Sequence, residues 1–189
     1  MKKIILSVLL ILSISLTFAQ DLENLKTEAN KAYVAGAKMD FDAIFETTYP
    51  KVFEIVSQDM MKMAFDQMFN NVDFSIKLVQ VEPDFNFGDF IKIGNQTFCM
   101  IQHNNKMIMT FNNKVDNANM MVDIFKSSMK TENVTFNEEE NAFHITMRST
   151  LIGVSDELTN NQWKFINKDE NNQLSKMIFS EEVIKTLGL

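Results

Sequence analysis

The spacing of apolar residues along this chain changes from a helical period to a strand period, and this change decides the fold class. From residue 21 to residue 69, apolar side chains recur at three- and four-residue steps, whereas from Asp73 onward most segments alternate apolar and polar residues. The first pattern is typical of amphipathic helices and the second of half-buried strands. Helices followed by strands predict a single α+β domain with a mainly antiparallel sheet.

Capping residues define the ends of the predicted helices. Asp40, Ser57 and Ser180 are of the residue types that cap helix N-termini, and Gly188 is of the type that ends a helix. Pro50 opens a further turn because it cannot donate a backbone hydrogen bond. The predicted helical segments are 21–39, a short helix after Asp40, 50–56, 58–69, an inserted helix at 117–129, and a short C-terminal helix at 181–187.

Two of the predicted strands, 97–103 and 106–111, form a hairpin across Asn104 and Asn105. An asparagine pair tolerates the positive φ that a two-residue turn requires. Cross-strand partners share a face of the sheet, so the hairpin has one inward, ligand-binding face and one mixed face that includes Cys99, Ile101 and His103. The predicted ligand-binding face consists of Phe98, Met100, Gln102, Met107, Met109 and Phe111. The remaining strands are predicted at 74–79, 90–93, 133–136, 142–152 and 162–166.

The methionine content suggests a copper(I) site, because soft sulfur ligands favour that ion, but the predicted hairpin argues against it. The chain has 14 Met and one cysteine, Cys99. The hairpin register separates Cys99 and His103 from Met100 and Met109, which then lie on the opposite face. We therefore interpret the methionines as flexible core residues and expect neither a metal nor another cofactor. A lone cysteine also excludes an internal disulfide.

The catalytic candidates are weak. His144 and Arg148 lie on the polar face of the 142–152 strand, where they could hold an anion or a carbonyl oxygen while a nearby carboxylate acts as a base. His103, placed beside the predicted turn, is expected to be solvated. The sequence contains no glycine-rich phosphate loop, nucleophile elbow or zinc motif.

The first 19 residues have the layout of a secretory signal peptide. Lys2 and Lys3 precede an apolar run, and cleavage is predicted between Ala19 and Gln20. We therefore expect an exported protein, periplasmic or secreted, without a membrane span after cleavage. Cleavage lowers the basic count from 18 to 16 against 25 acidic residues, a net charge of −9 that argues against nucleic acid as a partner.

The segment 41–45 together with 48–56, and the Thr-Phe-Ala-Gln sequence at 17–20, resemble small exported proteins of unassigned function from Bacteroidota. Their general shape is similar to the nuclear-transport-factor-2-like (NTF2-like, also called SnoaL-like) superfamily. The resemblance implies helices packed in the mouth of a strongly curved sheet, a cone that serves both enzymes and binding proteins. Fold analogy alone does not give an activity.

These observations leave three functions open. The first is a soluble, exported binding module that holds an apolar small molecule or a partner segment in a cone lined by Phe and Met. The second is a structural or envelope-interaction protein that acts as a homodimer through the mixed face, which contains Ile101 and Ile108. The third is an enzyme in which His144 is the acid or base.

Overall fold

Residues 21–189 form a mixture of helices and antiparallel sheet in the computed structural model, which confirms the predicted α+β class. These are the residues that the structure describes, so the predicted signal peptide and its cleavage point at Ala19 and Gln20 lie outside them. Between residues 21 and 189, no helix is both long enough and apolar enough to cross a bilayer.

Four helices open the described chain, and their ends follow the predicted capping residues. The first covers residues 21–38, and it is followed by α2 (Phe41–Thr47), α3 (Val52–Ile55) and α4 (Gln58–Phe69). The Asp40 side chain accepts a hydrogen bond from the backbone nitrogen of Ala43, and the Ser57 side chain accepts one from that of Met60, both at 3.2 Å. Each bond satisfies a backbone donor that has no partner within its helix. The predicted starts of α2 and α4 are thus confirmed.

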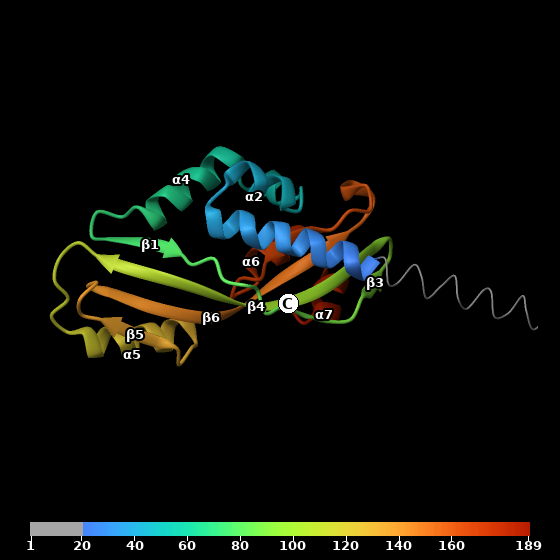
Figure 1. Ribbon diagram of the computed structural model, residues 1–189. Coiled ribbons are helices and arrows are strands. Elements are labelled where there is room, and N and C mark those ends of the chain that lie inside the picture. The colour runs from blue at the N-terminus through green and yellow to red at the C-terminus, as the bar shows by residue number, and fades with distance from the viewer. Residues whose placement is uncertain (1–20) are drawn as a thin grey trace, which may run out of the picture.

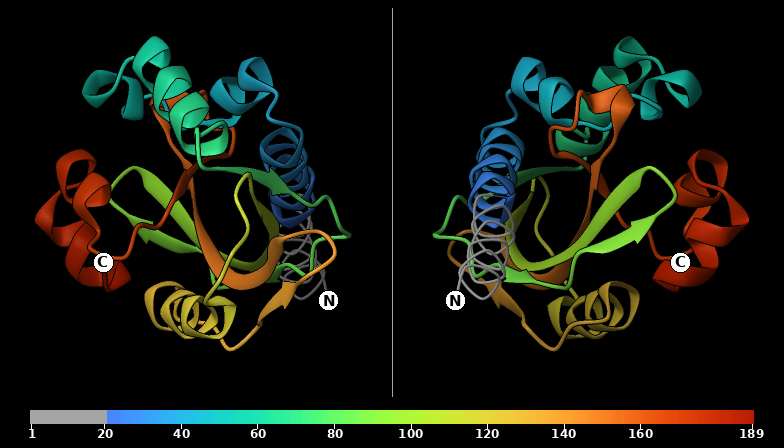
Figure 2. Two further views of the ribbon diagram at one scale, coloured as in Figure 1. Left: turned by 90° about the vertical axis from the view of Figure 1, so that its left-hand side faces the viewer. Right: turned by 90° about the vertical axis from the view of Figure 1, so that its right-hand side faces the viewer.

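The sheet of the described chain is built around two long strands, β4 and β6. Its order is β1-β4-β6-β5, with β2 and β3 also paired to β4 and β7 paired to β6. Figure 1 shows β4 and β6 crossing the molecule, and Figure 2 shows how β6 bends between the surrounding helices. The strands are β1 (Phe74–Leu78), β2 (Asn86–Phe87), β3 (Ile91–Ile93), β4 (Gln96–Phe111), β5 (Val134–Asn137), β6 (Ala142–Ser155) and β7 (Lys164–Asn167).

The predicted hairpin across Asn104 and Asn105 is wrong, because both residues lie inside the continuous strand β4. Asn104 pairs with Arg148 and Asn105 with Met147, within an unbroken register between β4 and β6. Neither asparagine has the positive φ of a two-residue turn. A long partner strand supplies backbone hydrogen bonds on both sides of the asparagine pair, and this tertiary pairing outweighs the local turn preference.

Loss of the hairpin also separates the six residues predicted to share a ligand-binding face. Side chains alternate between the two faces of a continuous strand. Phe98, Met100 and Gln102 therefore point to one side of β4. Met107, Met109 and Phe111 point to the other side. Cys99 and His103, predicted to oppose Met109, share its face instead.

The face of β4 that carries Phe98 is covered by the C-terminal helices. These are α6 (Gln173–Ile178) and α7 (Glu181–Leu187). Phe179, between the two helices, packs in the same buried cluster as Phe98 of β4. The rings of Phe98 and Phe179 lie edge to face with their centroids 5.4 Å apart. Ser180 caps α7, and Gly188 follows it with φ +67°, as the sequence predicted.

The opposite face is covered in two places. Leu25 and Ala29 of the helix over residues 21–38 pack on Cys99 and Ile101, while α5 (Ala118–Met129) packs on the far end of the strands. Of the two residues predicted to form a dimer contact, Ile101 is buried here and Ile108 lies on the opposite face of β4, so they do not share a surface. The homodimer itself stays a prediction. Between the two covered ends, α2 and α4 approach the sheet and a pocket remains.

Candidate functional site

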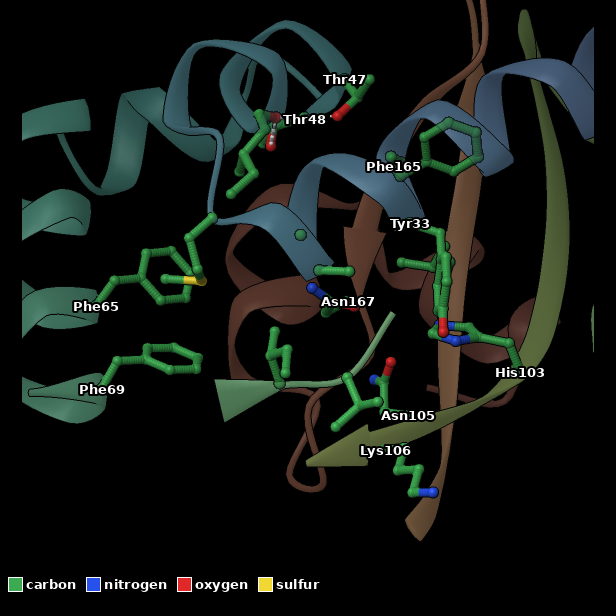
Figure 3. Close-up of a pocket in the computed structure, with 18 residues that line it drawn as sticks. Tyr33, Thr47, Thr48, Phe65, Phe69, His103, Asn105, Lys106, Phe165 and Asn167 are labelled. Carbon is green, nitrogen blue, oxygen red and sulfur yellow. Dashed lines mark hydrogen bonds between the residues drawn. The ribbon is translucent and has the colours of Figure 1, made fainter. Parts of the chain in front are cut away.

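The pocket lies where β4 changes its edge partners. β1 pairs with β4 as far as Met107 and β2 pairs with it from Gln102, so residues 103–106 have no strand partner on that edge. The backbone nitrogen of Val79 still donates to the carbonyl of Lys106 at 2.8 Å. A cavity of about 180 Å³ opens at this gap, between the helices and the sheet (Figure 3).

The sheet wall of the pocket comes from three adjacent strands. His103 and Asn105 of β4 alternate onto the same face as Leu151 of β6 and Asn167 of β7, because Leu151 pairs with both Ile101 and Asn167. Pairing between neighbouring strands therefore brings residues that are distant in the sequence onto one wall of the pocket.

The helix wall of the pocket is mostly apolar. Tyr33 and Gly36 come from the helix over residues 21–38, Ile44 from α2, and Phe65 and Phe69 from α4. A β-carbon built on Gly36 meets no atom within 4 Å, so this glycine leaves open space toward the pocket.

His103 is buried in the sheet wall of the pocket, which corrects the prediction that it is solvated. Its side chain is 3 % exposed, and the rings of Tyr33 and Phe85 stand edge-on to the imidazole at centroid distances of 5.5 and 5.7 Å. Burial lowers the pKa of His103 below its ordinary value. Nδ1 lies 3.4 Å from the carbonyl oxygen of Asn104, and Nε2 has no hydrogen-bond partner among the described residues.

Other polar groups of the pocket are fixed by the protein itself. The Asn105 amide nitrogen donates to Ser149 Oγ at 2.8 Å. The Thr47 hydroxyl donates to the carbonyl of Ala43 at 2.9 Å, and the Thr48 hydroxyl donates to its own helix in the same way. With those protons engaged, these side chains present acceptor oxygens toward the pocket.

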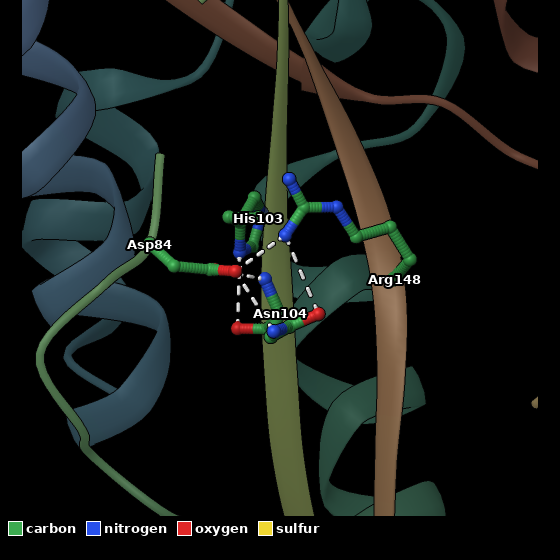
Figure 4. Close-up of polar contacts among 4 residues, drawn as sticks. All are labelled: Asp84, His103, Asn104 and Arg148. Atoms are coloured by element: carbon green, nitrogen blue, oxygen red, sulfur yellow. Dashed lines mark hydrogen bonds and ion pairs between the residues drawn. The ribbon is translucent and has the colours of Figure 1, made fainter. Parts of the chain in front are cut away.

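A polar cluster closes the edge of β4 beside His103. Asp84 accepts hydrogen bonds from the backbone and side-chain nitrogens of Asn104 at 2.7 and 2.8 Å, and from Arg148 at 2.6 Å (Figure 4). The backbone bond from Asn104 is the main reason that the pKa of Asp84 is lowered. The carboxylate thus replaces the strand partner that Asn104 lacks.

The two catalytic candidates from the sequence are not brought together. His144 contacts Glu140 through Nε2, whereas Arg148 pairs with Asp84. Neither residue lines the pocket. A carboxylate does lie beside His144, as the enzyme hypothesis required, but the lining of the cavity includes neither member of this pair. The hypothesis that His144 is an acid or base stays a prediction.

The six residues predicted to bind a ligand also lie outside the pocket wall. Phe98 is enclosed with α6 and α7, while Met107 belongs to the core beneath α5. The wall is formed instead by residues between these two groups along β4. Gln102, the polar member of the predicted set, is exposed.

Tyr49 and Asp156 form a buried polar pair that stabilises the fold. The Tyr49 hydroxyl donates to Asp156 Oδ2 at 2.7 Å, Gln96 donates to the same oxygen at 2.8 Å, and the backbone nitrogen of Thr159 donates to Oδ1 at 3.1 Å. Burial, followed by the bond to Asp156, raises the pKa of Tyr49. A carboxylate with these donors is satisfied by the protein and needs no ligand.

No metal centre is found in the part of the chain from residue 21 onward. Groups of three or more His, Cys, Asp or Glu side chains able to hold an ion are absent there. Cys99 is buried, and its thiol lies 3.3 Å from the carbonyl oxygen of Gly88. Burial raises the pKa of this thiol to about 11, so it stays protonated at neutral pH.

Sequence reasoning missed His103 and Asn105 because it placed them at a turn. The available signal was the length of the 142–155 run, which requires a partner strand of similar length rather than a short hairpin arm. The contribution of Tyr33 had no such signal, since only the packing of its helix brings it to β4.

Comparisons of this chain with protein-family models, with curated proteins and with solved structures gave no match.

Proposed function

We propose that this protein is an exported binding protein, with NTF2-like architecture, that holds a small and mainly apolar molecule between its helices and its curved sheet. The observation that carries the proposal is the pocket of about 180 Å³, whose walls are largely aliphatic and aromatic and include a few acceptor groups at fixed positions. Such a combination is typical of small-molecule sites.

Export rests on the signal sequence at residues 1–19 and points to the periplasm or the extracellular space. The NTF2-like assignment rests on the resemblance of segments 41–45 and 48–56 and is supported by helices that lie against a bent sheet (Figure 2). The homodimeric and enzymatic alternatives have no feature of the pocket in their favour.

Gly36 allows the pocket to be blocked without disturbing the sheet. Its φ is not in the left-handed region and its β-carbon would enter open space, so a side chain is accommodated there. Gly36→Phe fills the cavity, while Gly36→Ala is the matched control that changes helix propensity but leaves most of the space free. Gly36→Ala is expected to stabilise the fold by about 0.4–1 kcal/mol.

The test is a thermal-shift screen of neutral molecules of up to about ten non-hydrogen atoms. A molecule present at tenfold its Kd contributes about 1.4 kcal/mol, which corresponds to about 3–5 °C in Tm for a chain of this size. We expect binding molecules to raise the Tm of the wild type and of Gly36→Ala, but not that of Gly36→Phe. Equal shifts in all three proteins, or no shift across the screen, would contradict the proposed function.

A further inference from the structure

The hydrogen-bonding state of the sheet wall restricts the chemistry of the ligand. A neutral imidazole has one donor and one acceptor nitrogen. The carbonyl oxygen of Asn104, which can only accept, lies 3.4 Å from Nδ1 of His103, so it favours the tautomer in which Nδ1 carries the proton and Nε2 is the acceptor. Among residues 21–189, the buried Nε2 has no partner.

A second acceptor lies two residues along the same strand. Because the Asn105 amide nitrogen donates to Ser149, its oxygen Oδ1 is the free end of the amide. His103 and Asn105 share one face of β4 and both line the pocket (Figure 3). Of these two acceptors, the Asn105 oxygen belongs to a half-exposed residue, so it is the one that a hydrogen-bond donor of the ligand can reach.

The charge of the wall favours a neutral donor. Among the described residues that line the pocket none is acidic, so a cationic amine would have no counter-charge. Lys106 is the basic residue of the lining, and Figure 3 shows its side chain running away from the other labelled residues. With His103 neutral as well, a carboxylate would also be buried without a partner.

The size and the wall composition indicate one ring. An engineered apolar cavity of about 150 Å³ holds benzene, and this pocket, at about 180 Å³, is slightly larger. Phe65, Phe69 and Phe165 line it and can make edge-to-face contacts with an aromatic ring.

We propose that the ligand is a neutral, single-ring aromatic alcohol whose hydroxyl donates its one proton to Asn105 Oδ1. This inference rests on the proposed binding function and specifies its ligand class. Asn105 is half-exposed and its oxygen is open to contact, whereas Nε2 of His103 is buried.

Phenol and toluene provide the test, because they match in shape and differ in the hydroxyl. We would measure the Kd of each by calorimetry at about pH 7.5, using the exported chain and its Asn105→Leu variant. The ratio of the toluene Kd to the phenol Kd is expected to fall about tenfold in the variant, the loss of one buried hydrogen bond. Benzoate, which has the ring but carries a charge, is expected not to bind.

A nitrogen NMR measurement on the wild type keeps the test independent of whether the variant folds. Phenol is expected to shift the side-chain amide resonance of Asn105, and toluene is expected to leave it in place. An unchanged Kd ratio, or an Asn105 amide resonance that phenol does not move, overturns the assignment of the acceptor.

The experiments distinguish a wrong ligand class from a wrong binding function. If phenol and toluene do not bind but other molecules stabilise Gly36→Ala and not Gly36→Phe, the ligand class is wrong and the binding function stands. If nothing distinguishes those two Gly36 variants, both proposals fail.

Discussion

At the scale of single residues, the position of His103 changes the meaning of its chemistry. On a solvated turn its imidazole would titrate as it does in a peptide, but within β4 it is enclosed by Tyr33 and Phe85. Burial disfavours the charged form, and this lowers the pKa of His103 relative to its value of about 6.5 in an unfolded chain. A buried neutral histidine makes stability depend on pH.

The sign of that dependence follows from proton binding. Between the lowered pKa of the folded state and about 6.5, the unfolded chain binds more protons at this site, so the free energy of unfolding decreases as pH falls. We expect the wild type to lose more stability between about pH 7.5 and about pH 5 than His103→Gln does. Urea denaturation of both proteins at each pH measures the difference. A variant with the same loss as the wild type would show that His103 is not buried neutral.

At the scale of elements, local sequence preferences were sufficient to predict the ends of helices whose capping contacts lie within a few residues. Asp40, Ser57 and Ser180 cap the helices that the sequence predicted, and Gly188 ends the last one. Capping depends on a few neighbouring residues, so it can be read without the tertiary structure. β4 is different because its continuity depends on β6, which is remote in the sequence.

Asn105→Gly distinguishes the two interpretations of this segment in solution. Glycine after asparagine favours a two-residue turn, so a hairpin would be unaffected or stabilised. In the continuous strand, glycine is expected to cost about 1–2 kcal/mol, from backbone entropy and the lost bond to Ser149. Equilibrium unfolding in urea measures this change.

Asn160→Gly is the matched control for that substitution. Asn160 already has the left-handed φ of +53°, which glycine adopts without strain. The free energy of unfolding of the Asn160→Gly variant is expected to stay within about 0.5 kcal/mol of that of the wild type. A strand interpretation of β4 would be untenable if Asn105→Gly were as well tolerated as this control.

At the scale of the whole molecule, helices from the N-terminal and C-terminal parts of the chain pack on opposite faces of the sheet formed by the long strands β4 and β6. α6 and α7 cover one face near Phe98, while the helix over residues 21–38 covers the other near Cys99 (Figure 1). The pocket is a consequence of this arrangement, because helices from the first half stand over strands from the second.

Export is the prediction that concerns the entire chain. Expression of residues 1–189 in a bacterial host is expected to yield an envelope-fraction product that begins at Gln20, because residues 1–19 have the features of a cleaved signal peptide. Intact-mass measurement with N-terminal sequencing identifies the new start. Lys2→Glu with Lys3→Glu removes the basic start and should leave precursor in the cytoplasm, whereas a precursor of full mass from the unaltered sequence would count against the signal.

The sequence by itself determined the α+β class, the succession of most helices and strands and several helix ends, since these follow from apolar spacing and from caps a few residues away. It did not predict β2 or α6. Only the tertiary structure decided that Asn104 and Asn105 continue a strand, that His103 is buried and that the Phe98 and Met107 groups face opposite ways. The physical reason is that strand pairing and burial depend on partners that are remote in the sequence, whose contacts outweigh local preference.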